Sequence, residues 1–191
     1  MAIRIFHGFD SLPAFRHPAV TVGSYDGVHR GHQALIHKLK EAALTQGGET
    51  IVLTFDPHPR VTLHRAEGLV LLSSLEEKAR LLEWAGVENL VVIPFDERFS
   101  ALTGEEFVRD YLIGKLGAEC LVAGYNHRFG HDRKDCSELN IDGLKVIRVD
   151  ACDVNGIRVS STKIRNLIAE GNTSRAEELL GHPLNFKTQE R

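Results

Sequence analysis

The sequence predicts an α/β protein whose mostly parallel sheet carries helices on both faces. Short apolar runs rich in β-branched residues predict strands, and segments with apolar residues at helical spacing lie between most of them. Strands that alternate with helices are typical of a parallel sheet covered on both faces. Ligands of such sheets bind beyond the carboxyl ends of the strands. The turns that follow the apolar runs are therefore the first candidates for a site.

The predicted strands begin near the N-terminus and continue into the last third of the chain. In order they are residues 3–6, 19–22, 50–55, 90–94, 120–123 and 145–149. The helices between them carry start and stop signals. Ser74, with Glu77 three residues later, has the spacing of a capping box, and Thr103 is the expected cap of the next helix. The predicted helices are residues 33–45, 74–85, 104–116 and two short helices within 160–180, separated by Gly171 and Asn172.

Other residues along these helices predict structure rather than chemistry. Gly86 and Gly117 are expected to end their helices, because glycine readily adopts the left-handed conformation of a helix C-terminus. Trp84 lies near two leucines on one helix face and is expected in the core. The charged runs 76–78 and 177–178 are expected on solvated faces.

Composition narrows the class of protein. A chain of 191 residues with a net charge of −3 suits one globular domain and has no basic footprint for nucleic acid. No window is apolar for long enough to span a membrane, and the N-terminus lacks the pattern of a signal peptide. The three cysteines, Cys120, Cys136 and Cys152, form no C-x-x-C pair, so reduced thiols and a cytoplasmic location are expected. The sequence does not indicate an oligomeric state.

The most informative segment is residues 23–32, which join the predicted strand 19–22 to a helix. Glycines in such a turn let the backbone approach a phosphate, and unpaired N–H groups at a helix start attract anions. His29 and His32 face the same way on the first turn and can donate hydrogen bonds to developing negative charge. The alternatives are a capping turn with two exposed histidines or, less well supported, a metal site. The residues concerned are Gly23, Ser24, Tyr25, Asp26, Gly27, His29, Gly31 and His32.

Three further segments follow predicted strands or precede a helix. Ser160, Ser161 and Thr162 could cap a helix or bind phosphate, and Arg165 is a natural bidentate partner of phosphate oxygens. In residues 124–130, Asn126 could contact a base or ribose, whereas Phe129 fits the core equally well. In residues 54–60, His58 could contact substrate or lie on a surface loop. The set His131, Asp132, Asp135 and Cys136 matches no standard spacing, so no metal site is expected.

Taken together, four of these strings resemble a known family. G-x-x-D-G-x-H-x-G-H, T-F-D-P-H-P, G-Y-N-x-R-F-G and S-S-T-K-I-R occur in this order from about residue 20 to 180. The chain is similar to the FMN adenylyltransferase (FAD synthetase) module of bacterial bifunctional riboflavin kinase/FAD synthetases, in the nucleotidylyltransferase superfamily. The resemblance implies a Rossmann-like fold and the reaction of ATP with FMN to give FAD and pyrophosphate by direct in-line displacement.

The resemblance also implies roles for individual residues. His29, His32 and Arg165 would be catalytic, and Mg²⁺ would accompany ATP, held mostly by phosphate oxygens and water. No residue is expected to bind the metal directly. The implied FMN contacts are Phe55, Pro57, His58, His127 and Arg128. The implied ATP contacts are Gly23, Ser24, Tyr25, Asp26, Gly27, Gly31, Asn126, Ser160, Ser161 and Thr162.

The chain departs from the family pattern in three ways. His127 stands where the family has an aromatic residue, typically phenylalanine, and a glycine is missing after Arg133 and Lys134. Residues 1–182 are expected to form the adenylyltransferase domain, with 183–191 as a tail and the riboflavin kinase barrel absent. If the chain is a fragment, a kinase module is an expected partner.

Two alternatives to FMN adenylyltransferase activity remain open at this point. One is the same chemistry on nicotinamide mononucleotide or phosphopantetheine, and the other is a nucleotide-binding module without turnover.

Overall fold

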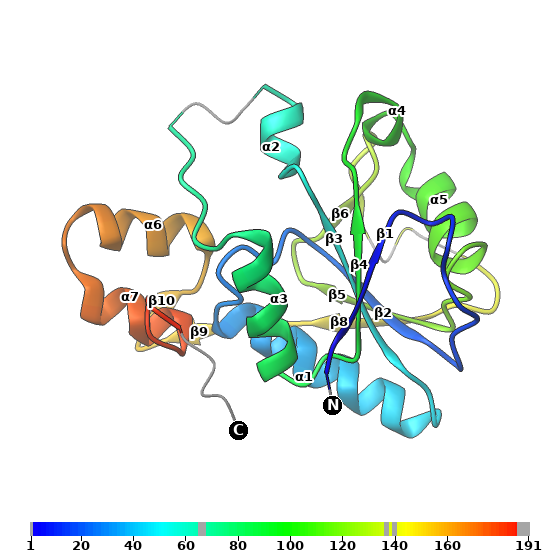
Figure 1. The fold of residues 1–191 in the computed structure, drawn as a ribbon, viewed down its shortest axis with the longest axis horizontal. Coiled ribbons are helices and arrows are strands. Elements are labelled where there is room, and N and C mark those ends of the chain that lie inside the picture. The colour runs from blue at the N-terminus through cyan, green and yellow to red at the C-terminus, as the bar shows by residue number, and fades with distance from the viewer. Residues whose placement is uncertain (1, 65–67, 136–137, 139–140, 187–191) are drawn as a thin grey trace.

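A six-stranded parallel sheet lies at the centre of the molecule in the computed structural model, which describes residues 2–64, 68–135, 138 and 141–186 (Figure 1). The strands follow one another in the order β1-β4-β3-β2-β5-β8, and each neighbouring pair is parallel. They are β1 Arg4–His7, β2 Ala19–Val22, β3 Thr50–Phe55, β4 Asn89–Ile93, β5 Cys120–Gly124 and β8 Lys145–Val149.

Helices cover both faces of this sheet because successive strand residues point to opposite sides. Ala19 and Val52 pack on one face with α1 (Arg30–Thr45) and α3 (Leu75–Trp84). Val20 and Ile51 pack on the other face against the helical segment that starts with α5 (Gly104–Glu106) and continues as the π-helix η1 (Phe107–Ile113). The predicted α/β class with helices on both faces is confirmed.

The strand order reverses between β2 and β5, and this reversal positions the site. From β2 the chain proceeds outward through β3 and β4, then returns to place β5 on the other side of β2. The crossovers on the two sides of β2 thus leave in opposite directions, and a crevice opens beyond the carboxyl ends of β2 and β5. Both glycine-containing turns that the sequence singled out, after Val22 and after Ala123, lie at this crevice.

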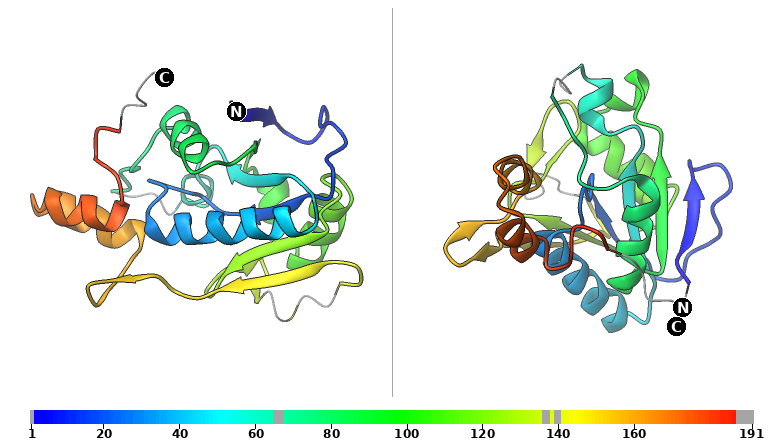
Figure 2. Two further views of the ribbon diagram at one scale, coloured as in Figure 1. Left: turned by 90° about the horizontal axis from the view of Figure 1, so that it is seen from below. Right: turned by 60° about the vertical axis from the view of Figure 1, so that its left-hand side comes forward.

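The C-terminal helices lie beside the sheet rather than over it (Figure 1). Helices α6 (Ser161–Ala169) and α7 (Thr173–Leu180) share a separate apolar cluster that includes Ile164 and Leu179. The β9–β10 hairpin (Asp153–Val154 with Ile157–Arg158) leads from β8 into α6, and Figure 2 shows hairpin and helices at the same end of the molecule. Hydrogen bonds from Arg30 to the Glu178 carbonyl and from Gln33 to the Leu180 carbonyl fasten this unit to α1.

Smaller elements complete the rim of the crevice. They are α2 (Pro59–Thr62), α4 (Glu97–Ser100) and the antiparallel pair of β6 (Arg128–Phe129) and β7 (Lys134–Asp135). None of these elements was predicted, since each is only about one helical turn or two residues long. Within the described ranges, no helix is long and apolar enough to cross a membrane.

The predicted elements match the structure closely, with informative exceptions. Each predicted strand agrees within one residue, and the capping box of Ser74 and Glu77 is present. Gly86, with a φ of +85°, follows the cap of α3 as predicted. Gly117 has a φ of +66°, but its helix ends earlier than predicted, at Ile113, and a turn separates the two. The first helix, however, begins at Arg30 rather than Gln33, because His29 is its cap.

Three predictions about helix residues are wrong. The third helix is regular only to Glu106 and then widens into the π-helix. Trp84 is 51% exposed, because it packs at the edge of α3 against His182 and Phe186 from the C-terminal segment. Lys78, expected on a solvated face, is 6% exposed. Phe129, left open, is a core residue with 2% exposure.

Candidate active site

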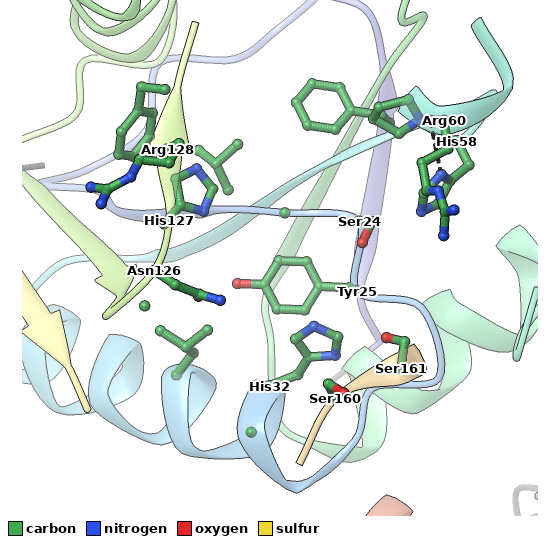
Figure 3. A pocket seen from close by; sticks show the side chains of 18 of the residues that line it. Ser24, Tyr25, His32, His58, Arg60, Asn126, His127, Arg128, Ser160 and Ser161 are labelled. Atoms are coloured by element: carbon green, nitrogen blue, oxygen red, sulfur yellow. Dashed lines mark hydrogen bonds between the residues drawn. The ribbon is translucent and has the colours of Figure 1, made fainter. Parts of the chain in front are cut away.

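A cavity of about 890 Å³ opens at the carboxyl ends of β2, β3, β5 and β8. Figure 3 shows its lining from within: Tyr25, His32, Ser160 and Ser161 lie close together, and Asn126, His127 and Arg128 form another side. We call residues 23–32 with 160–165 the histidine side, and residues 125–135 the arginine side. His58, which caps α2, and Arg60, within that helix, lie at the rim of the cavity.

The turn of the histidine side is strained and tightly packed. Val28 has a φ of +37°, an uncommon conformation for a β-branched residue, and Tyr25 has a φ of +47°. Tyr25 is 1% exposed, and its hydroxyl lies 2.7 Å from Thr21 Oγ1. A side chain at Gly27, where φ is +78°, would contact Leu72 at 2.9 Å. Such strain persists only where the surroundings hold the backbone, as at functional sites.

The two histidines stack on each other at the start of α1. Their ring centroids are 3.7 Å apart with an interplanar angle of 10°, as expected for residues facing the same way. The His32 backbone N–H donates to His29 Nδ1 at 3.3 Å, so His29 is both the helix cap and a cavity residue. A side chain at Gly31 would press on the His29 ring at 3.3 Å, which explains the glycine there.

Burial keeps both rings neutral. It lowers the pKa of His29 to about 4, partly offset by the negative charge of Asp26. The pKa of His32 lies well below its usual value, because the ring is buried and because a positive charge on it would be repelled by a protonated His29 and by Lys78. Neutral imidazoles at pH 7 each carry one N–H donor, which suits charge stabilisation in a partly dry site.

Asp26 does not line the cavity; it connects three segments beneath it. Its carboxylate accepts hydrogen bonds from the backbone N–H groups of Leu72 and Ser73, at 2.8 and 3.2 Å. The same carboxylate pairs with Arg165 at 2.5 Å, with 2% of the Asp26 side chain exposed and 16% of that of Arg165. Gly27 also lies outside the lining, whereas Arg165 reaches it.

The hydroxyls before α6 combine the two expected roles. Ser160 caps the helix by accepting from the Lys163 N–H at 3.2 Å, and Ser161 donates to the Asp26 carbonyl at 3.1 Å. Ser160, Ser161 and Thr162 all line the cavity together with Ser24. The cap therefore also directs polar groups and a helix N-terminus into the cavity.

At the rim, β3 ends in the segment that carries His58. The Arg60 N–H donates to His58 Nδ1 at 3.1 Å, and burial lowers the pKa of His58. Phe55 lines the cavity within an aromatic group that includes Phe95 and Phe99. Pro57, joined to Asp56 by a cis peptide bond, is not part of the lining.

On the arginine side, charged groups hold one another. Asp135 pairs with Arg128 and, at 3.5 Å, with Arg148. The His127 ring packs on Phe129 with centroids 4.2 Å apart, and burial lowers the pKa of His127 to about 4. Asn126 is exposed and lines the cavity, and in Figure 3 its side chain points toward the Tyr25 ring.

Sequence reasoning missed two basic residues near the cavity. Arg158 lines the cavity, and its guanidinium lies 5.2 Å from the centre of the Tyr125 ring. Lys78 is buried behind the histidine side. Lys78 gave a signal in retrospect, because it follows Leu75 at an i+3 position and so shares the inner face of its helix. Arg158 gave none.

The charge of the lining suits a phosphate-rich ligand. Arginines and histidines from both sides face the cavity, and Asp150 is the one carboxylate among the described residues that line it. The part of the chain that the structure describes contains no group of three or more His, Cys, Asp or Glu side chains able to hold a metal. Cys136, from the set considered in the sequence, lies outside the described residues.

Comparisons with known proteins agree with this geometry. The chain is 34% identical over 186 residues to the bifunctional riboflavin kinase/FMN adenylyltransferase of Escherichia coli K12, covering 95% of this chain and 59% of that protein. It thus spans less than two thirds of this relative's length. A crystal structure titled as a macrolide-efflux protein from Streptococcus pneumoniae matches with a TM-score of 0.87 and 32% identity, covering 95% of this chain and 63% of that one.

A more distant structure shows the fold alone. The pantoate-beta-alanine ligase of Francisella tularensis matches with a TM-score of 0.57 and 16% identity, covering 93% of this chain and 86% of that one. The family model described as FAD synthetase matches residues 13–163, which contain the histidine turn, the cavity rim and the first residues of α6. On the strength of that match, the chain belongs to the FAD synthetase family.

Proposed function

We propose that this chain is an FMN adenylyltransferase, which transfers AMP from ATP to FMN and releases pyrophosphate. The observation that carries the proposal is the stacked, neutral pair His29 and His32 at the start of α1, facing a basic cavity in a member of the FAD synthetase family. The name of the Escherichia coli relative includes the same activity.

In the proposed reaction, a phosphate oxygen of FMN attacks the α-phosphorus of ATP. A new P–O bond forms as the bond from the α-phosphorus to the bridging oxygen breaks, and pyrophosphate leaves with that electron pair. No covalent enzyme intermediate is needed, so catalysis consists of positioning and charge stabilisation. His29 and His32 would donate N–H groups to the charge that develops on the transferred phosphate and the leaving pyrophosphate.

The remaining expected contacts divide between the two substrates. Arg165 would neutralise the ATP phosphates, with its guanidinium fixed by Asp26. The other expected ATP contacts are Gly23, Ser24, Gly31, Asn126 and the hydroxyls of 160–162. Asp26 and Gly27 would act by shaping the turn, and Tyr25 by supporting the His32 ring, 4.8 Å away. Phe55, His58, His127 and Arg128 would contact FMN, with Pro57 shaping the segment before His58.

Mg²⁺ fits this site as an ion that arrives with ATP. The cavity offers hydroxyls and a single carboxylate among its described lining, which cannot form a cage of protein oxygens. Phosphate oxygens and water would supply most of its ligands. When bound, the ion would neutralise phosphate charge.

The domain assignment is part of the same proposal. Residues 1–182 would form the adenylyltransferase domain, and the riboflavin kinase module named in the Escherichia coli relative is the proposed partner activity. The described part of the tail packs on the domain, since the Leu184 N–H donates to Glu177 and Phe186 contacts Trp84. Residues 187–191 lie outside the described residues.

We also propose a cytoplasmic site of action, where thiols such as Cys120 and Cys152 stay reduced.

The test is to incubate the purified chain with Mg-ATP and FMN and to follow FAD and pyrophosphate by chromatography. The expected result is equal amounts of both products, and none with riboflavin, which lacks the attacking phosphate. Pyrophosphate release with nicotinamide mononucleotide or phosphopantetheine, but not with FMN, would change the acceptor. ATP binding without turnover on any of these acceptors would contradict the proposal and favour a binding module.

A further inference from the structure

Lys78 is a buried cation that forms no ion pair with any carboxylate in the described part of the chain. It lies on the inner face of α3, and 6% of the residue is exposed. Its ammonium donates to Thr54 Oγ1 at 3.3 Å, and among the described residues no ion pair neutralises it. A buried ammonium that gives one of its three protons to a neutral oxygen is costly to keep. Such a group calls for a functional reason.

The position of Lys78 connects it to both substrate regions of the cavity. Thr54, fully buried at the end of β3, donates in turn to the Ser24 carbonyl at 3.2 Å, so Lys78 supports the histidine turn from behind. Its charge also lowers the pKa of His32 in the turn and of His58 at the rim. Lys78 therefore lies behind the cavity wall where these two regions meet.

The negative charges near Lys78 do not satisfy it. Asp26 attracts it but is already held by Arg165 and by two backbone N–H groups. Asp56 attracts it as well, but that residue is exposed and forms no ion pair with it. The pKa of Lys78 is lowered, because the effect of burial exceeds the attraction of these two carboxylates. An anion in the cavity would supply the missing negative charge.

We propose that Lys78 is a positioning residue whose ammonium attracts and orients a substrate phosphate bound between the Ser24 turn and His58. It acts through the wall by its charge, without lining the cavity, and its hydrogen bond to Thr54 only holds the ammonium behind the Ser24 turn. The inference rests on the proposed function for the identity of the anion, the phosphate of ATP or of FMN. A lysine with a purely structural role would donate the same hydrogen bond to Thr54 without changing the affinity for either substrate.

Two neutral variants separate charge from packing. Lys78→Gln keeps a donor group, and Lys78→Met keeps an unbranched apolar side chain that is one atom shorter. Lys38→Met is the matched control, since Lys38 is an exposed lysine on α1 that pairs with Glu41. Thr54→Val removes the hydrogen bond and leaves the charge. Calorimetry measures the Kd of Mg-ATP and of FMN for each variant, and kcat and KM are measured alongside.

We expect both Lys78 variants to weaken the binding of one substrate by about tenfold or more, the effect of removing one charge at short range from an anion in a partly buried site. Thr54→Val and Lys38→Met should stay within about twofold. Weaker ATP binding would place the anion on the histidine side, and weaker FMN binding would place it at the rim. Unchanged Kd values for both substrates in a folded Lys78 variant would overturn the proposal.

Nuclear magnetic resonance gives readouts that do not depend on turnover. In Lys78→Gln the pKa of His58 should rise, because a nearby positive charge is lost. In the wild-type chain the pKa of Lys78 itself should rise when ATP or FMN binds, and this measurement remains if neither variant folds. A Lys78 resonance that responds to neither ligand would overturn the proposal. Failure of the wild-type chain to make FAD would contradict the proposed function and leave these binding tests intact.

Discussion

On the histidine side of the cavity side chains are held by burial, whereas on the arginine side they are held by ion pairs close to solvent. His29 is 7% exposed and its ring is fixed by a stacked neighbour and a backbone N–H. Arg128 is exposed and is held by Asp135. Buried neutral groups keep one geometry and one protonation state, which reaction chemistry requires. Charged groups near water attract an anion and adapt to its shape.

The comparison predicts its largest effect at the histidines. His29→Ala or His32→Ala should lower kcat by about 100- to 1,000-fold, the cost of losing one preorganised donor to a transition state. The KM for ATP should change by about threefold or less, because the ground state is bound mainly by other groups. Steady-state FAD formation measures both. His37→Ala, at an exposed position on the same helix, is the control. Equal losses in kcat and in ATP affinity would contradict a transition-state role.

A second prediction compares two ion pairs. Asp26→Ala should lower the free energy of unfolding by about 3 kcal/mol, since it leaves Arg165 and two backbone N–H groups without their partner in a buried site. Asp153→Ala, which breaks the exposed pair with Arg158, should change it little. Urea denaturation followed by circular dichroism measures both. Similar losses for the two variants would show that burial does not distinguish these ion pairs.

The contrast between the two sides also explains what the sequence could predict. Local sequence patterns are enough to predict strands such as 19–22. They also predict the histidine turn, because its strand, its glycines and its helix cap are neighbours in the chain. The Asp26–Arg165 pair joins residues 139 positions apart, and no local pattern announces it. The burial of Lys78 likewise depends on how α3 packs over β3, and the charged run 76–78 was wrongly expected on a solvated face.

The arginine side was less predictable for the same reason. The two-residue strands β6 and β7 are too short for any periodicity, and their pairing depends on tertiary contacts such as the bridge between Thr103 and Gly130. Trp84 looked like a core residue because its helix face is apolar. It lies half-exposed at the edge because the C-terminal segment, not the sheet, covers that side.

A third prediction concerns acid stability. Burial lowers the pKa of His29 and His127 to about 4 and also lowers that of His32. Since these folded values lie below the unfolded value of 6.5, the unfolded chain binds more protons between about pH 4 and 6.5. Stability should therefore fall as the pH is lowered through this window, by at most about 1.4 kcal/mol per pH unit for each ring. Thermal unfolding at a series of pH values measures this, and a flat profile would contradict neutral buried rings.

The smallest expected effect is at His127, on the arginine side. His127→Phe keeps an aromatic ring against Phe129 and removes both ring nitrogens from the cavity. We expect a change of about two- to fivefold in the KM for FMN, the effect of one neutral hydrogen bond, with the KM for ATP unchanged. The variant should also be less sensitive to acid, because one ring that must stay neutral is gone. Parallel assays of FAD formation with each substrate varied, and unfolding at pH 5 and 7, measure these effects. A change confined to the KM for ATP would indicate that His127 contacts ATP instead of FMN. It would contradict the assignment of one substrate to each side of the cavity.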